Sequence, residues 1–149
     1  MKRSTLFLIV PAMIAALALM LAPTQPAAVA DGHGDGDGHE VLHEAMETLQ
    51  DNFRQVRRQM GDADQNESSA ELLAEMIEAS IAAKAVMPET ATTDDLETSY
   101  RVIMNRLIVE LALAENAALE GDNAALREHL SAANSVKGDG HELFIADDE

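Results

Sequence analysis

Residues 39–60 have the sequence HEVLHEAMETLQDNFRQVRRQM, and this stretch decides the fold. Its apolar residues recur at alternating intervals of four and three positions, which places them on one face of an α-helix. They are Leu42, Met46, Leu49, Phe53, Val56 and Met60. A helix with such a face is not stable alone in water, because the face must be buried against other helices. The pattern therefore predicts a helical bundle.

A second helix is expected after the polar connection GDADQNE, which follows Met60. Ser68 and Glu71 have the spacing of a capping box, which predicts the start of this helix. Pro88 is expected to stop it, because proline cannot continue a helix. The apolar residues that this helix is expected to carry are Leu72, Leu73, Met76, Ile77, Ile81 and Met87.

Two more helices follow the loop PETATTDD. Asp94 with Glu97 repeats the capping pattern, and Gly121 is expected to end the third helix. Asp122 can cap the fourth helix across a turn so short that the two helices must be antiparallel neighbours. The inward residues of the third helix are Leu96, Tyr100, Ile103, Met104, Leu107, Leu111 and Ala114. The sequence thus predicts an all-α, antiparallel up-down-up-down four-helix bundle.

A methionine and a histidine are candidate metal ligands in this bundle. In the fourth helix, Leu126, Leu130, Ala133, Lys137 and His141 lie roughly on one face. The imidazole of His141 is therefore expected to point inward, which is costly unless something binds it. The start of the first helix and the end of the fourth lie at the same end of such a bundle, so Met46 and His141 can face each other. The thioether of Met46 suits either core filling or axial ligation of iron.

The segments AMETLQDNF and ALEGDN, with a histidine near the C-terminus, resemble the cytochrome b-562 family over residues 40–144. The resemblance implies a periplasmic bundle that holds one non-covalent haem b between Met46 and His141, which are 95 positions apart. The expected pocket is lined by Leu49, Phe53, Tyr100, Met104 and Leu107. These five residues are equally expected in the core of any four-helix bundle.

Electron transfer is the function that this resemblance implies. With methionine and histidine in both axial positions, iron has no open position for a substrate and can only change its oxidation state. The sequence has no identifiable nucleophile–base pair or carboxylate dyad, so catalysis is not expected. The expected partners are periplasmic redox proteins with a basic docking patch, and the protein is expected to be a monomer or a weak dimer.

Residues 1–30 have the pattern of a cleaved secretory signal peptide. Lys2 and Arg3 precede an apolar run, and residues 28–30 form an A-x-A cleavage site. Cleavage would leave 119 residues in the periplasm, with a flexible Gly/Asp/His tail at 31–38 and the bundle at 39–149. No membrane contact is then expected, and a retained N-terminal anchor is the alternative.

The composition excludes several partners. The formal net charge is −17, and signal cleavage would remove two of the ten basic residues and none of the 27 acidic ones, leaving −19. Such a charge argues against nucleic acid and anionic lipid as partners. The chain has no cysteine, so it can form no disulfide, no thiolate metal site and no covalent haem attachment.

Two other functions stay open on the sequence. His33, His39 and His43 can bind a divalent metal, because His39 and His43 have the i, i+4 spacing of many metal sites. His39 or His43 can also replace Met46 as an iron ligand. Alternatively, the bundle keeps the fold without haem and has a structural or regulatory role.

Overall fold

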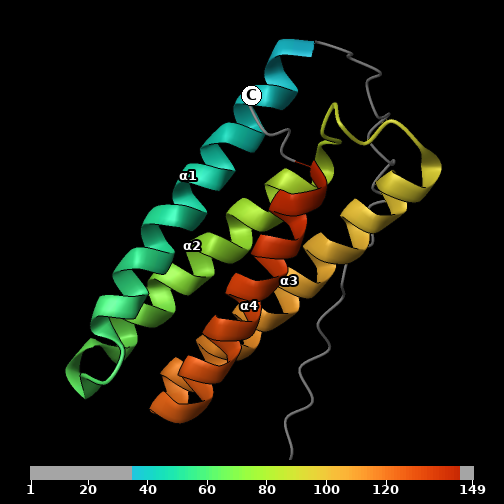
Figure 1. The fold of residues 1–149 in the computed structure, drawn as a ribbon. Helices are drawn as coiled ribbons and strands as arrows, with labels where there is room; N and C mark the ends of the chain where they lie inside the picture. Colours follow the sequence, from blue (N-terminus) through green and yellow to red (C-terminus); the bar gives the residue numbers. More distant parts are fainter. Residues whose placement is uncertain (1–34, 145–149) are drawn as a thin grey trace, which may run out of the picture. The chain divides into compact units, whose positions relative to one another are not determined.

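The computed structural model describes residues 35–144, and four α-helices account for most of them (Figure 1). They are α1 (Asp35–Gln59), α2 (Asn66–Ala85), α3 (Asp94–Glu120) and α4 (Asn123–Phe144), with a short 3-10 helix, η1 (Ala63–Gln65), between α1 and α2. Residues 35–144 contain no strand, so the predicted all-α four-helix bundle is confirmed. The predicted signal peptide lies outside the described residues.

The two ends of the bundle are built from different parts of the chain. At one end, here called the terminal end, the Thr90 hydroxyl in the α2–α3 connection donates to the Phe144 carbonyl at 2.8 Å. Figure 1 shows the first turns of α1 at this end as well. At the other end, here called the turn end, the α1–α2 and α3–α4 turns lie beside each other.

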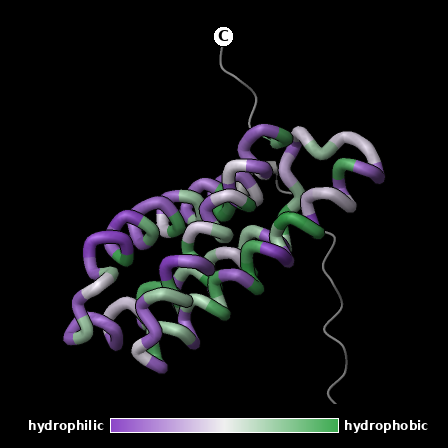
Figure 2. The backbone as a smooth tube through the Cα atoms, turned by 60° about the horizontal axis from the view of Figure 1, so that its bottom comes forward, coloured by the Kyte–Doolittle hydropathy of each residue, from purple (hydrophilic) through white to green (hydrophobic). Residues whose placement is uncertain are grey.

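Apolar side chains from all four helices fill one core along the length of the bundle. Figure 2 shows hydrophobic residues recurring along each helix between hydrophilic ones, as amphipathic helices require. The largest fully buried side chains are Leu49, Leu73, Met76, Leu111, Leu126, Leu130 and Val56. Ile81 of α2 does not belong to this core, because 54% of the residue is exposed. Among the described helices, none is both long enough and apolar enough to cross a membrane.

The first helix begins earlier than expected. α1 starts at Asp35 rather than His39, so it includes the second half of the segment predicted as a flexible tail. A Cβ atom added at Gly38 would lie 3.0 Å from Cγ1 of Val86 in the α2–α3 connection. Glycine therefore lets this first part of α1 pack closely against the connection, a tertiary contact that composition cannot reveal.

The capping box predicted for the second helix is wrong. α2 begins at Asn66, and its N-cap residue, Gln65, makes no side-chain capping bond. Ser68 accepts a hydrogen bond from Nε2 of Gln59 at 3.1 Å, and Ser69 donates to Oε1 of Gln59 at 2.9 Å. The two serines therefore tie α2 to the end of α1 instead of starting the helix.

Local capping chemistry decides the other helix ends. Thr93, one residue before the predicted Asp94, caps α3 by accepting from the Leu96 amide at 3.2 Å. Gly121 ends α3 in the left-handed conformation, with φ of 74°, which glycine adopts without strain. Asp122 accepts from the amides of Ala124 and Ala125, both at 3.0 Å, so its predicted capping of α4 is confirmed.

Candidate functional site

α1 and α4 are the least closely joined neighbours in the bundle. Close backbone contacts connect α1 with α2, α2 with α3, and α3 with α4, but almost none connects α1 with α4. A side-chain contact bridges the two helices, because Nζ of Lys137 lies 5.7 Å from the centroid of the Phe53 ring. This contact joins two facing surfaces, one on α1 and one on α4. We call these surfaces the α1–α4 seam.

Met46 lies on the seam side of α1. It precedes Phe53 by seven residues, which is almost two full helical turns. Both side chains therefore project from nearly the same side of α1. A different side of α1 faces α2. Asn52 marks it, because its Nδ2 donates to Oε2 of Glu75 on α2 at 2.9 Å. Met46 is 37% exposed at the seam, toward the terminal end.

His141 lies on the seam side of α4. It follows Lys137 by four residues, about one helical turn, and therefore shares the face that meets Phe53. Partial burial, and secondarily the Lys137 ammonium, lower the pKa of His141 below its ordinary value. Both causes favour the neutral imidazole, which is the form that binds a metal.

The expectation that both ligand candidates point into the core is wrong, because Met46 and His141 are exposed. The buried positions of α4 are Leu126, Leu130, Ala133 and Val136. The next position in this series is Gly140, whose added Cβ would lie 3.3 Å from Cγ2 of Ile103 on α3. His141 is thus rotated from the core toward the seam, where a ligand can reach it.

The five residues predicted to line the pocket are all buried in the bundle core. Their exposed fractions are 1% for Leu49, 4% for Phe53, 6% for Tyr100, 7% for Met104 and 3% for Leu107. The structure brings these residues into one cluster, and Phe53 joins that cluster to the seam. Whether they contact a haem stays a prediction.

Phe144 is a residue of this region that the sequence analysis missed. Its ring meets that of Tyr100 edge to face, with centroids 5.4 Å apart. The sequence feature that could have identified Phe144 is its position three residues after His141, at the end of the last helical turn. Phe144 closes the core at the terminal end of the bundle.

Tyr100 offers a test of this packing, since it is the only tyrosine in the chain. Its hydroxyl donates to the Ala83 carbonyl at 2.7 Å, and burial raises its pKa from 10.0 to about 12. Above pH 10 the unfolded chain loses this proton before the folded one, so stability should fall as the pH rises from 10 toward 12. Ultraviolet titration of the haem-free protein should give a tyrosinate midpoint near 12, against about 10 in urea. A midpoint near 10 without urea would contradict the buried position.

Two basic residues face each other at the seam. Burial and the nearby Arg57 guanidinium lower the pKa of Lys137. Among residues 35–144, the ion pairs are Arg54–Asp51, Arg101–Glu97 and the His129–Glu110 contact, so none involves Arg57 or Lys137. Arg57 and Lys137 therefore place two basic side chains near the seam of an acidic chain.

The predicted metal site at the N-terminal histidines gains no support. His39 and His43 are exposed on α1, and His33 lies outside the described residues. Within residues 35–144, no three His, Cys, Asp or Glu side chains are grouped in a way that could hold a metal ion.

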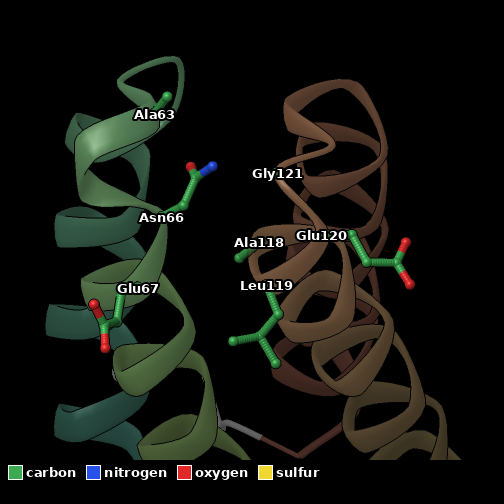
Figure 3. Close-up of a pocket in the computed structure, with 7 residues that line it drawn as sticks. All are labelled: Ala63, Asn66, Glu67, Ala118, Leu119, Glu120 and Gly121. Carbon is green, nitrogen blue, oxygen red and sulfur yellow. The ribbon is translucent and has the colours of Figure 1, made fainter.

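A surface cavity of about 450 Å³ lies at the turn end, away from Met46 and His141. Figure 3 shows Asn66 and Glu67 on one side of it and Ala118 and Leu119 on the other. Ala63, Glu120 and Gly121 complete the lining, which contains neither methionine nor histidine. This cavity is therefore not the site predicted from the sequence.

The residues at the seam have the chemistry that a haem requires. They provide a thioether, an imidazole whose pKa is lowered by partial burial, and a buried apolar core beside the least closely joined pair of helices. These features define a helical bundle whose α1–α4 seam offers a thioether and an imidazole as candidate iron ligands. The chain belongs to the cytochrome b562 family, whose model matches residues 41–144. None of the curated proteins compared with the sequence matches it. The family consists of haem-binding electron carriers and is not a family of enzymes.

Proposed function

We propose that the protein is a periplasmic electron carrier that binds one non-covalent haem b through Met46 and His141. The observation that carries this proposal is the α1–α4 seam, which presents a thioether and an imidazole toward the same end of the bundle. Since α1 and α4 have almost no backbone contact, the seam can widen without separating the other helix pairs.

The roles of the residues follow from their chemistry. When bound, haem supplies a one-electron ferric–ferrous couple. Met46 offers a soft, neutral sulfur, which favours the ferrous state, while His141 offers a neutral ring nitrogen. Buried Leu49 and Phe53 exclude water from the inner side of the seam. Because the chain has no cysteine, nothing can attach the porphyrin covalently.

Location and partner are part of the same proposal. The A-x-A pattern at residues 28–30 supports export to the periplasm. Four glutamates are exposed on α2, at positions 67, 71, 75 and 78. This acidic row supports docking of a redox partner through a basic patch, since complementary charge speeds association.

An absorption spectrum of the protein, expressed with its full N-terminal sequence, tests the proposal. The reduced protein should show the sharp, split visible bands of a six-coordinate low-spin haem. Acidified acetone should extract all of the haem, because no covalent bond holds it. A colourless protein that takes up no haemin would support the haem-free alternative instead.

Met46→Ala tests the weaker of the two ligand assignments. The variant should keep its haem through His141 but bind carbon monoxide, because one axial position is now open. Met60→Ala is the matched control, since Met60 is a half-buried methionine that directly follows the other end of α1. If Met46→Ala leaves the spectrum unchanged, the methionine assignment is wrong, and His43→Ala and His39→Ala should be measured next.

A further inference from the structure

The last turn of α4, which carries His141, is weak as a piece of helix. Gly138 and Gly140 lie within the three residues before His141, and glycine is among the poorest helix formers. Gly138 faces open space, because an added Cβ atom would meet nothing within 4 Å. The last four carbonyl groups of a helix also lack partners within that helix. This turn therefore depends on contacts with other parts of the fold.

Two contacts at Phe144 supply what the turn lacks, and we call them the Phe144 clamp. The Thr90 hydroxyl donates to the Phe144 carbonyl at 2.8 Å, which gives a partner to one carbonyl of the helix end. The Phe144 ring meets the Tyr100 ring edge to face, and the Tyr100 hydroxyl donates to the Ala83 carbonyl at 2.7 Å. The clamp thus connects the end of α4 with α2, with α3 and with the connection between them.

The α2–α3 connection, residues 86–93, also reaches the other helix of the seam. Gly38 in the first turns of α1 lies so close to Val86 that an added Cβ atom would be 3.0 Å from Cγ1 of Val86. Direct backbone contact between α1 and α4 is almost absent. At the terminal end, the two helices that carry the ligand candidates are therefore held largely through this connection (Figure 1).

We propose that Thr90 is a positioning residue for His141, which acts through the Phe144 carbonyl and keeps the imidazole on the α1–α4 seam. The role of His141 in this inference rests on the proposed function. Phe144 follows His141 by three residues, so both belong to the same helical turn. Opening of that turn would move the imidazole away from the seam, whereas the Thr90 hydrogen bond opposes the opening. Partners that orient a metal ligand in this way contribute to the affinity of the site.

Hydrogen exchange in the haem-free protein tests the clamp without any ligand. Thr90→Val removes the hydroxyl at nearly constant size, and the amides of residues 141–144 should then exchange about two- to tenfold faster. Thr90→Ser keeps a hydroxyl and should exchange at the wild-type rate. Thr92→Val is the matched control, because Thr92 is also an exposed threonine of the same connection. Unchanged exchange in Thr90→Val, or equal acceleration in Thr92→Val, would overturn the proposal.

Haemin dissociation tests whether the clamp positions His141. Transfer of haemin to an excess of a haem-free globin should be about two- to tenfold faster from Thr90→Val, because opening of the last turn detaches His141. Thr90→Ser should restore the wild-type rate, and Thr92→Val should leave it unchanged. A threonine with only a structural role would change the urea midpoint of the protein without changing this rate.

The two measurements separate this proposal from the proposed function. If the wild-type protein takes up no haemin, the proposed function fails, and hydrogen exchange alone decides whether Thr90 holds the turn. If the wild-type protein binds haem but Thr90→Val releases it at the wild-type rate, the proposed function stands and the positioning role of Thr90 is overturned.

Discussion

Replacing His141 with alanine is expected to remove most of the haem from the purified protein. His141 would supply one of two axial ligands, and even an outer partner of a metal ligand changes affinity by roughly 10- to 100-fold. Loss of the ligand itself should therefore weaken haem binding by more than about a hundredfold. The ratio of haem to protein, measured after haemin titration and gel filtration, gives the result. Because His141 is exposed, the variant should remain helical by circular dichroism.

His129→Ala is the matched control for this experiment. His129 lies on the same helix but pairs with Glu110 on α3, with Nδ1 and Oε2 2.9 Å apart. This variant should retain haem at the wild-type ratio even if it is slightly less stable. If His141→Ala keeps its haem while His129→Ala loses it, the α1–α4 seam is not the haem site.

Leu111→Ala should cause a large loss of stability in the haem-free bundle. Leu111 has no exposed surface and lies well inside α3, so its truncation leaves a cavity in the core. Such substitutions cost about 2.7–5 kcal/mol of unfolding free energy. Leu119→Ala, the same change at a position that is 64% exposed, should stay within about 0.5 kcal/mol.

Urea denaturation of the haem-free protein measures the unfolding free energy of both leucine variants. Equal losses in Leu111→Ala and Leu119→Ala would contradict the burial that distinguishes the two positions. A loss in both below about 1 kcal/mol would indicate a loosely packed core that collapses around the truncated side chain.

Features that depend on a few neighbouring residues could be predicted from the sequence. Gly121 ends α3 because its left-handed conformation suits glycine, and Asp122 caps α4 because its carboxylate reaches amides two and three residues ahead. The apolar spacing of Leu49, Phe53 and Val56 places all three in the core. These outcomes follow from backbone geometry and helical periodicity, which act over one or two turns.

Features that depend on a distant segment could not be predicted from the sequence. Ser68 has the spacing of a capping residue, but α2 starts two residues before it, and its hydroxyl accepts a hydrogen bond from Gln59 of α1 instead. Gly38 favours a flexible tail by composition, yet its contact with Val86 belongs to a helix that begins at Asp35. In both cases a tertiary partner outweighs the local preference.

The candidate ligands show the same division. The sequence alone determined which residues are candidate iron ligands, because a thioether lies near the beginning of the first helix and an imidazole near the end of the last. Only the tertiary structure decided that Met46 and His141 face the α1–α4 seam rather than the core. The physical reason is that periodicity defines a helical face only to within a residue or so, whereas burial depends on where the neighbouring helices pack.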